Sequence, residues 1–163
     1  QEHGINDVDA LEAYISEKRA TVDSKKQQLD AQTAELKDLK KLPESWDTYK
    51  RLKSIADGLR DLKFTKAKEK YKKEHASELK QFYTANRLLS KYCHDGKYDS
   101  RAIAARYAEL EKEHAATYAD FNEIREETQM MWRIRSHIDA ALKNQTQTKE
   151  EIQMNRKEKN AIE

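Results

Sequence analysis

The chain has 163 residues, of which 38% are charged and 37% hydrophobic, with three glycines and one proline. This composition is typical of long helices exposed to solvent. It excludes a membrane-spanning protein, because no apolar run approaches the roughly 20 residues needed to cross a bilayer. The 32 basic and 30 acidic residues give a net charge of +2, so an argument for nucleic-acid binding must come from local clustering.

A single cysteine, Cys93, excludes an intrachain disulfide framework and suits a reducing compartment. Its simplest interpretation is a half-buried thiol at a helix end. No secretory signal pattern opens the chain, so we expect a soluble, cytoplasmic protein. The chain begins with Gln1 rather than Met, which predicts a piece of a longer protein.

The first predicted helix covers 8–42, after Asn6 and Asp7, either of which can cap its first turn. Two rows of residues that repeat every seven positions mark one face of this helix, and the second row is polar in the middle. The polar middle predicts a thin, wet contact in which lysine stems cover apolar surface. The two series are Val8, Ile15, Val22, Leu29 and Leu36, and Leu11, Lys18, Lys25, Gln32 and Leu39.

Pro43 is expected to end that helix and to begin a second, shorter one over 43–62, since proline suits the first helical position. Gly58 lies inside this second helix and costs up to about 1 kcal/mol against alanine, so the far end frays or stops there. The apolar residues of this helix recur at spacings of three and four, and they are Trp46, Tyr49, Leu52, Ile55, Ala56, Leu59 and Leu62.

A lysine-rich stretch follows, in which six lysines and one acidic residue fall within 63–73. Thr65 is a candidate cap for a third helix that reaches Cys93, and Asp95-Gly96 would close it. The apolar face of this helix consists of Tyr71, His75, Leu79, Phe82, Ala85 or Asn86, and Leu89.

The longest predicted helix covers 100–142, begins at Asp99 or Ser100, and has no glycine or proline. At 1.5 Å per residue it spans roughly 65 Å, more than the about 40 Å diameter of a compact globule of this size. We therefore expect an elongated bundle. Its two heptad series are Ile103, Leu110, Thr117, Ile124, Met131 and Ile138, and Tyr107, His114, Phe121, Thr128, Arg135 and Leu142.

These patterns together predict an all-α fold in which the first and last helices form a long antiparallel, coiled-coil-like pair, with two shorter helices packed beside it. Residues 1–143 would form a helical accessory domain. The polar tail over 144–163 either continues the helix or is loose.

Few residue groups suggest chemistry. Glu111 and His114 match one Glu-x-x-His element of di-iron bundles, but such sites need two copies, so His114 is interpreted as a partly buried polar interruption of the seam. We expect no cofactor, metal site or catalytic residue. Met130, Met131 and Trp132, with Ile134 and Ile138, are interpreted as the place where the shorter helices pack on the long one, with Trp46 as a neighbour.

The lysine-rich stretch has two interpretations, a solvated helix face or a contact with a nucleic-acid backbone. Lysines in the first turn oppose the helix dipole, which an anion docked at that helix end would offset. The interleaved aromatic rings could stack on unpaired bases. We call the lysines among these residues the lysine cluster, and the predicted contact residues are Lys63, Lys66, Lys68, Lys70, Lys72, Lys73, Phe64 and Tyr71.

The order of segments resembles the helical C-terminal region of relaxases, the mobilisation nucleases of conjugative elements in Gram-positive bacteria. The resemblance covers roughly 4–142. It rests on Gly4-Ile5-Asn6-Asp7-Val8-Asp9-Ala10-Leu11-Glu12-Ala13-Tyr14-Ile15, on Tyr49-Lys50-x-Leu52-Lys53, on Tyr71-Lys72-Lys73-Glu74-His75-Ala76-Ser77-Glu78-Leu79, on Asp95-Gly96-Lys97, and on Tyr107-Ala108-Glu109-Leu110 running on to Tyr118.

In that family an N-terminal domain carries a histidine cluster and a tyrosine that nicks DNA at the transfer origin of a plasmid or transposon. This chain has no His-x-His element, so no catalytic residue is carried over. The resemblance implies a non-catalytic accessory domain that contacts DNA, single-stranded or without sequence preference, or binds conjugation proteins. The alternative is a generic coiled-coil interaction or homodimerisation module.

Overall fold

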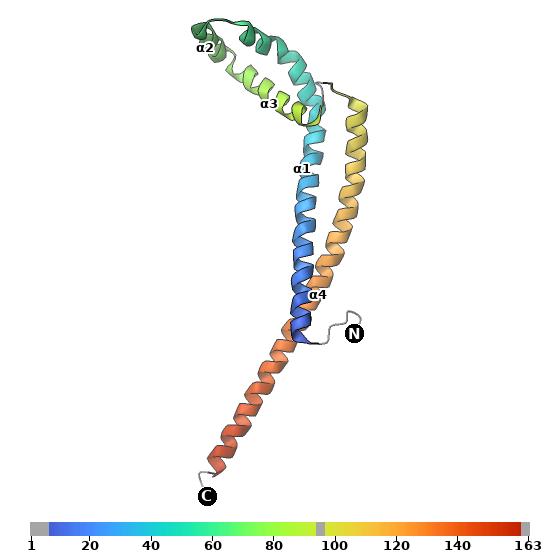
Figure 1. The fold of residues 1–163 in the computed structure, drawn as a ribbon, viewed down its shortest axis with the longest axis vertical. Helices are drawn as coiled ribbons and strands as arrows, with labels where there is room; N and C mark the ends of the chain where they lie inside the picture. Colours follow the sequence, from blue (N-terminus) through green and yellow to red (C-terminus); the bar gives the residue numbers. More distant parts are fainter. Residues whose placement is uncertain (1–6, 94–96, 161–163) are drawn as a thin grey trace. The chain divides into compact units, whose positions relative to one another are not determined.

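A computed structural model describes residues 7–93 and 97–160, and the side chains of all but 153 and 155–160 among them. Over these ranges the elements are α1 (Val8–Asp61), α2 (Thr65–Glu74), α3 (Ala76–Tyr92) and α4 (Ser100–Asn160), with no strand (Figure 1). The predicted all-α fold is confirmed, because the first and last helices are long and pack against each other with shorter helices beside them.

The helices belong to two compact units, and α1 and α4 each contribute to both. Unit 1 consists of Gln1–Gln28 with Thr117–Glu163, and unit 2 of Leu29–Ala116. Unit 1 therefore contains one segment of α1 and one of α4. Unit 2 contains the rest of α1, the start of α4, and both short helices.

In unit 1 the two helix segments run antiparallel along the predicted seam. Leu11 and Ile15 of α1 are buried against Met131 of α4, with Tyr14 and Ile138 packed at the edge of the cluster. These side chains occupy the expected heptad positions or flank them. The predicted seam therefore holds in this unit as far as Ile138.

The polar middle of the seam is held by charge pairs in unit 1. The ammonium groups of Lys18 and Lys25 each lie 2.8 Å from a carboxylate of α4, those of Glu127 and Asp120 respectively. Glu127 also accepts a hydrogen bond from the hydroxyl of Tyr14, which raises the pKa of that phenol. The lysine stems are half-buried, as a contact covered by lysine methylene groups requires.

In unit 2 the core gathers leucines from three helices. Leu39 and Leu42 of α1 meet Leu89 of α3 and Leu110 of α4, and the side chains of Leu42 and Leu110 are fully buried. The α1 and α4 segments are antiparallel here too, since the guanidinium of Arg106 lies 3.0 Å from the carboxylate of Glu35, and the ring of His114 lies 3.2 Å from the hydroxyl of Thr33.

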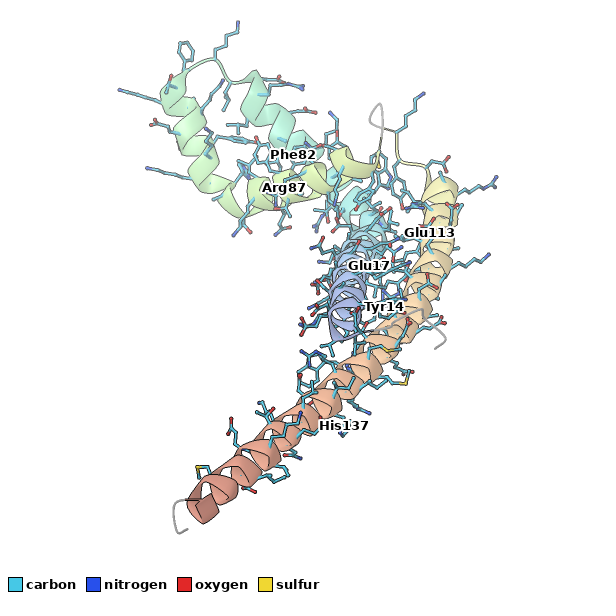
Figure 2. All side chains as sticks on the ribbon, turned by 60° about the horizontal axis from the view of Figure 1, so that its bottom comes forward. Tyr14, Glu17, Phe82, Arg87, Glu113 and His137 are labelled. Carbon is cyan, nitrogen blue, oxygen red and sulfur yellow. The ribbon has the colours of Figure 1, made fainter. Side chains whose placement is uncertain are left out.

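Aromatic stacking joins α3 and the connection just before α4 to α1. The ring of Trp46 stacks on those of Tyr49 and Tyr98, at 5.7 and 5.2 Å between centroids, and Tyr49 stacks on Phe82 at 5.2 Å. Phe82 thus faces α1, whereas Arg87 on the same helix is exposed (Figure 2). Each such pair adds about 0.5–1.5 kcal/mol beyond the area it buries.

Pro43 does not end the first helix, and that prediction is wrong. α1 continues through it to Asp61. An interior proline costs about 3 kcal/mol, because it removes a backbone N–H and its ring crowds the carbonyl of residue 39. Burying a leucine contributes about 1.5–3 kcal/mol, and Leu39, Leu42 and Leu52 are all buried on the continuous helix. Packing therefore outweighs the local preference.

The third predicted helix is divided at His75, where φ is −113° and ψ is 29°, so α2 and α3 are separate. Thr65 is not the cap of α2, because the N-cap residue is Phe64 and no side chain caps the helix. Gly58 does not stop α1. A Cβ atom at that position would lie 2.8 Å from the hydroxyl oxygen of Tyr71, so the glycine permits the close approach of α2.

The long helix begins as predicted, since the Asp99 carboxylate accepts hydrogen bonds from the backbone N–H groups of Arg101 and Ala102 at 2.9 and 3.2 Å. α4 continues through the polar segment to Asn160, and Leu142 is exposed. Asp7 caps α1, with its carboxylate 2.7 Å from the N–H of Ala10. The alternative cap Asn6 and the closing pair Asp95-Gly96 lie outside the described residues.

The two tryptophans do not mark one core, contrary to the prediction. Trp46 packs in unit 2, whereas Trp132 belongs to unit 1 and is 56% exposed. Met130 and Ile134 are exposed too, and Met131 is the residue of that group that packs on α1. The short helices belong to unit 2 with residues 100–116 of α4, whereas this stretch belongs to unit 1.

Candidate nucleic-acid interface

The lysine cluster lies on α2 and the connection before it. Lys63 precedes the helix, as does the neighbouring Phe64, and the other lysines of the cluster lie within the helix. No residue of α2 is buried, and every lysine of the cluster is exposed except Lys68, which is partly covered. Side chains along this helix project into solvent (Figure 2). The structure therefore presents the lysines of the cluster on α2 and the connection before it, where they are largely accessible.

The lysines of α2 divide into two groups around the helix. Lys66, Lys70 and Lys73 follow the spacing i, i+4, i+7 and share one face, which we call the lysine stripe. Lys68 and Lys72 lie four residues apart on another face. Separate stripes mean that not all the lysines can contact one linear backbone at once.

The N-terminal end of α2 is electrostatically uncompensated. Its first turn contains no acidic residue, and no side chain accepts hydrogen bonds from its free N–H groups. The lysine stripe begins in that turn at Lys66. Its single ion pair with a described residue joins the ammonium of Lys70 to the carboxylate of Glu74, at 3.8 Å and largely exposed to water. Such a pair contributes little, so the stripe keeps most of its positive charge.

The two aromatic residues differ in availability. Phe64 is 78% exposed, as the N-cap residue of α2. Tyr71 is half-buried, since its hydroxyl approaches Gly58 and its ring lies 4.4 Å from the ring of His75. Phe64 can stack on another ring, whereas Tyr71 holds α2 against α1. Sequence reasoning missed this role of Tyr71, although a glycine on the facing helix was an available signal.

Other titratable groups are held in structural contacts. Hydrogen bonding to Glu111 raises the pKa of the Tyr107 phenol, and burial raises the pKa of the Cys93 thiol. The described residues contain no group of three or more His, Cys, Asp or Glu side chains that could hold a metal ion. Along the described helices, no segment combines the length and apolar character needed to span a bilayer.

Comparison with known proteins reveals no relative. No protein-family model matches the chain, and no curated protein or solved structure matches it. The resemblance to relaxases therefore rests on the sequence motifs and stays a prediction.

Proposed function

We propose that this chain is a non-catalytic, cytoplasmic accessory domain of a conjugative relaxase, and that it contacts DNA through the lysine cluster. The observation that supports the DNA contact is the lysine stripe, an exposed row of Lys66, Lys70 and Lys73 beside an uncapped helix end. Ammonium groups and free N–H groups there would face the same phosphates. The relaxase assignment is supported by the sequence motifs.

The proposed contact is electrostatic and does not read sequence. Lysine ammonium groups recognise phosphate as point charges, so affinity should fall steeply with salt and depend little on base order. Phe64 adds a ring that can stack on a base of an unpaired strand. A strand with free bases should therefore bind at least as well as a duplex.

The test is a triple substitution of the lysine stripe, K66A/K70A/K73A. Because each lysine that contacts a phosphate contributes about 0.7–0.9 to the slope of log affinity against log salt, the slope should become shallower by roughly 2. The matched control is K112A/K143A/K149A, which removes the same charge from exposed positions of α4. Equal DNA affinity in both variants would exclude the lysine stripe.

A second candidate function is a coiled-coil interaction or homodimerisation module. It is favoured by Leu142 and Ile152, two exposed apolar residues on α4 that are 49% accessible. A dimer would double the mass in light scattering, with no effect of the lysine substitutions, and would lose that mass in L142A/I152A. The relaxase assignment has its own test, which is whether the reading frame upstream of Gln1 encodes a His-x-His nuclease domain.

A further inference from the structure

Trp132 occupies an unusual position in unit 1. Trp132 is 56% exposed and lines two hollows of about 360 and 300 Å³. Both hollows are also lined by Arg19 of α1, so a side chain from each helix borders both. Ser16 and Ser136 line the larger hollow, and Arg133 the smaller one. A large ring thus stands in an open, polar setting rather than in a core.

The charges around this ring are unevenly compensated. The guanidinium of Arg135 forms ion pairs with the carboxylates of Glu12 and Asp139, at 2.5 Å for Glu12, so one guanidinium is shared by both carboxylates. Arg19 and Arg133 are exposed and form no ion pair with any described residue. The two acidic side chains that line the hollows are therefore already paired, and two guanidinium groups remain beside the indole.

We propose that Trp132, Arg19 and Arg133 form a contact site for single-stranded nucleic acid, with a base stacked on the indole and the flanking phosphates held by the two guanidinium groups. Arginine suits phosphate because its planar fork donates two parallel hydrogen bonds. The indole supplies a stacking face that accepts any base. The site lies in unit 1, whereas the lysine cluster lies in unit 2.

An acidic peptide is the competing ligand, and the chemistry of the site favours nucleic acid. An acidic peptide needs only unpaired cations to attract its carboxylates, so a site for it would not require an exposed indole. A nucleotide uses both kinds of group at once, since it offers an anion and a π face a few bonds apart. The serine hydroxyls of the larger hollow can also bond to phosphate or sugar oxygens.

The first test measures binding of fluorescently labelled oligodeoxythymidylate to the 163-residue chain by anisotropy. W132A should weaken binding about tenfold, since one stacked base is lost. R19A/R133A should weaken it too and make the salt slope shallower by about 1.4, two phosphates at the single-strand value. The controls are M130A, which removes an equally exposed apolar side chain from the same helix, and K112A/K149A, which removes the same charge.

The second test follows the indole directly. Trp46→Phe leaves Trp132 as the sole tryptophan, so quenching of its fluorescence by the oligonucleotide should persist, whereas Trp132→Phe should abolish that component. Circular dichroism of each variant checks that the helices remain. Unchanged anisotropy in W132A, or no quenching in Trp46→Phe, would overturn the site. Poly-glutamate binding that equals oligonucleotide binding and also needs Trp132 would overturn the choice of ligand.

The inference goes beyond the proposed function, and the two can fail separately. If K66A/K70A/K73A has no effect on DNA binding but W132A does, the lysine stripe is excluded and the Trp132 site stands. The opposite pattern excludes the Trp132 site and supports the lysine stripe. Loss of binding in both sets of variants supports both sites.

Discussion

Gly58 and Tyr71 show how one contact can decide the identity of a residue. Glycine inside a helix costs about 1 kcal/mol against alanine, yet α1 has a glycine where Tyr71 of α2 packs against it. An added Cβ atom would lie 2.8 Å from the Tyr71 hydroxyl oxygen and 3.4 Å from its ring carbon Cζ. The hydroxyl is therefore the group that a methyl side chain would displace.

A double-mutant cycle tests this. In a Tyr71→Phe background, Gly58→Ala should raise the free energy of unfolding by roughly 0.5–1 kcal/mol, because the helix gains propensity without the hydroxyl contact. In the wild type the same change should stabilise less or destabilise. Urea denaturation of the four proteins gives both values. Equal effects in the two backgrounds would mean that the hydroxyl does not constrain position 58.

The free energy of unfolding should depend on pH through the carboxylate of Asp38. Its carboxylate accepts hydrogen bonds from the Lys91 ammonium at 2.7 Å and from the Tyr92 hydroxyl at 3.0 Å. The hydrogen bond from Lys91 contributes most to lowering the pKa of Asp38 below its ordinary value of 3.8. A native pKa below the unfolded one adds stability above the unfolded pKa, and this stability is lost as the pH falls through the native value.

Asp38→Asn should therefore lower the urea midpoint at pH 7, and its difference from wild type should shrink as the pH falls below 3.8. Asp30→Asn, an exposed position on the same helix, is the control and should have little effect. A difference between Asp38→Asn and wild type that stays constant down to pH 2 would show that the carboxylate charge is not what stabilises this contact.

At the scale of elements, α1 contains the conflict between local and tertiary preferences at Pro43. The apolar positions Leu39, Leu42, Trp46, Tyr49 and Leu52 continue in phase across the proline. Pro43 itself is exposed and borders an apolar hollow of about 560 Å³ with Tyr98 and Ile103. The helix thus keeps the proline because the buried leucines on either side of it outweigh its cost.

Pro43→Ala should stabilise the protein by up to about 3 kcal/mol, because alanine restores the backbone N–H and removes the ring that crowds the carbonyl of residue 39. Urea denaturation measures the change. Glu44→Ala, at the next and exposed position, should change stability by less than about 0.5 kcal/mol. A destabilised Pro43→Ala protein would mean that the helix geometry set by the proline is itself required for packing.

The two long helices, α1 and α4, show what sequence can predict. Heptad spacing correctly located Leu39, Leu110 and Met131 in buried seams, because the period of a helix decides which side chains share a face. Prediction from sequence failed at Pro43, where tertiary packing overrides the preference of proline for helix starts. It also failed at His75, where no local sequence signal predicts the break between α2 and α3. Trp132 was placed in a core because it stands in an apolar group with Met131 and Ile134, whereas exposure depends on which side chains the facing helix supplies.

At the scale of the whole molecule, the two units are stabilised differently. Unit 2 buries leucines from three helices and adds aromatic stacking. Unit 1 has a small apolar cluster around Leu11, Ile15 and Met131, and its seam also contains the buried Thr117 and Thr128 and charge pairs such as Lys25 with Asp120. Partly exposed charge pairs contribute little and are weakened by salt. Unit 1 should therefore be the less stable of the two.

Hydrogen exchange followed by mass spectrometry tests this, since local stability differs along a chain and sets exchange rates. Amides of residues 11–28 and 117–138 should exchange faster than those of 36–59 and 79–92, and the difference should grow with salt. Residues 144–152, where every side chain is exposed, should exchange fastest. Ile15→Ala should accelerate exchange mainly in unit 1 and Leu110→Ala mainly in unit 2, because each removes a buried side chain from one cluster. Uniform exchange along α1, or equal responses to the two substitutions, would show instead that the long helices unfold as single cooperative elements.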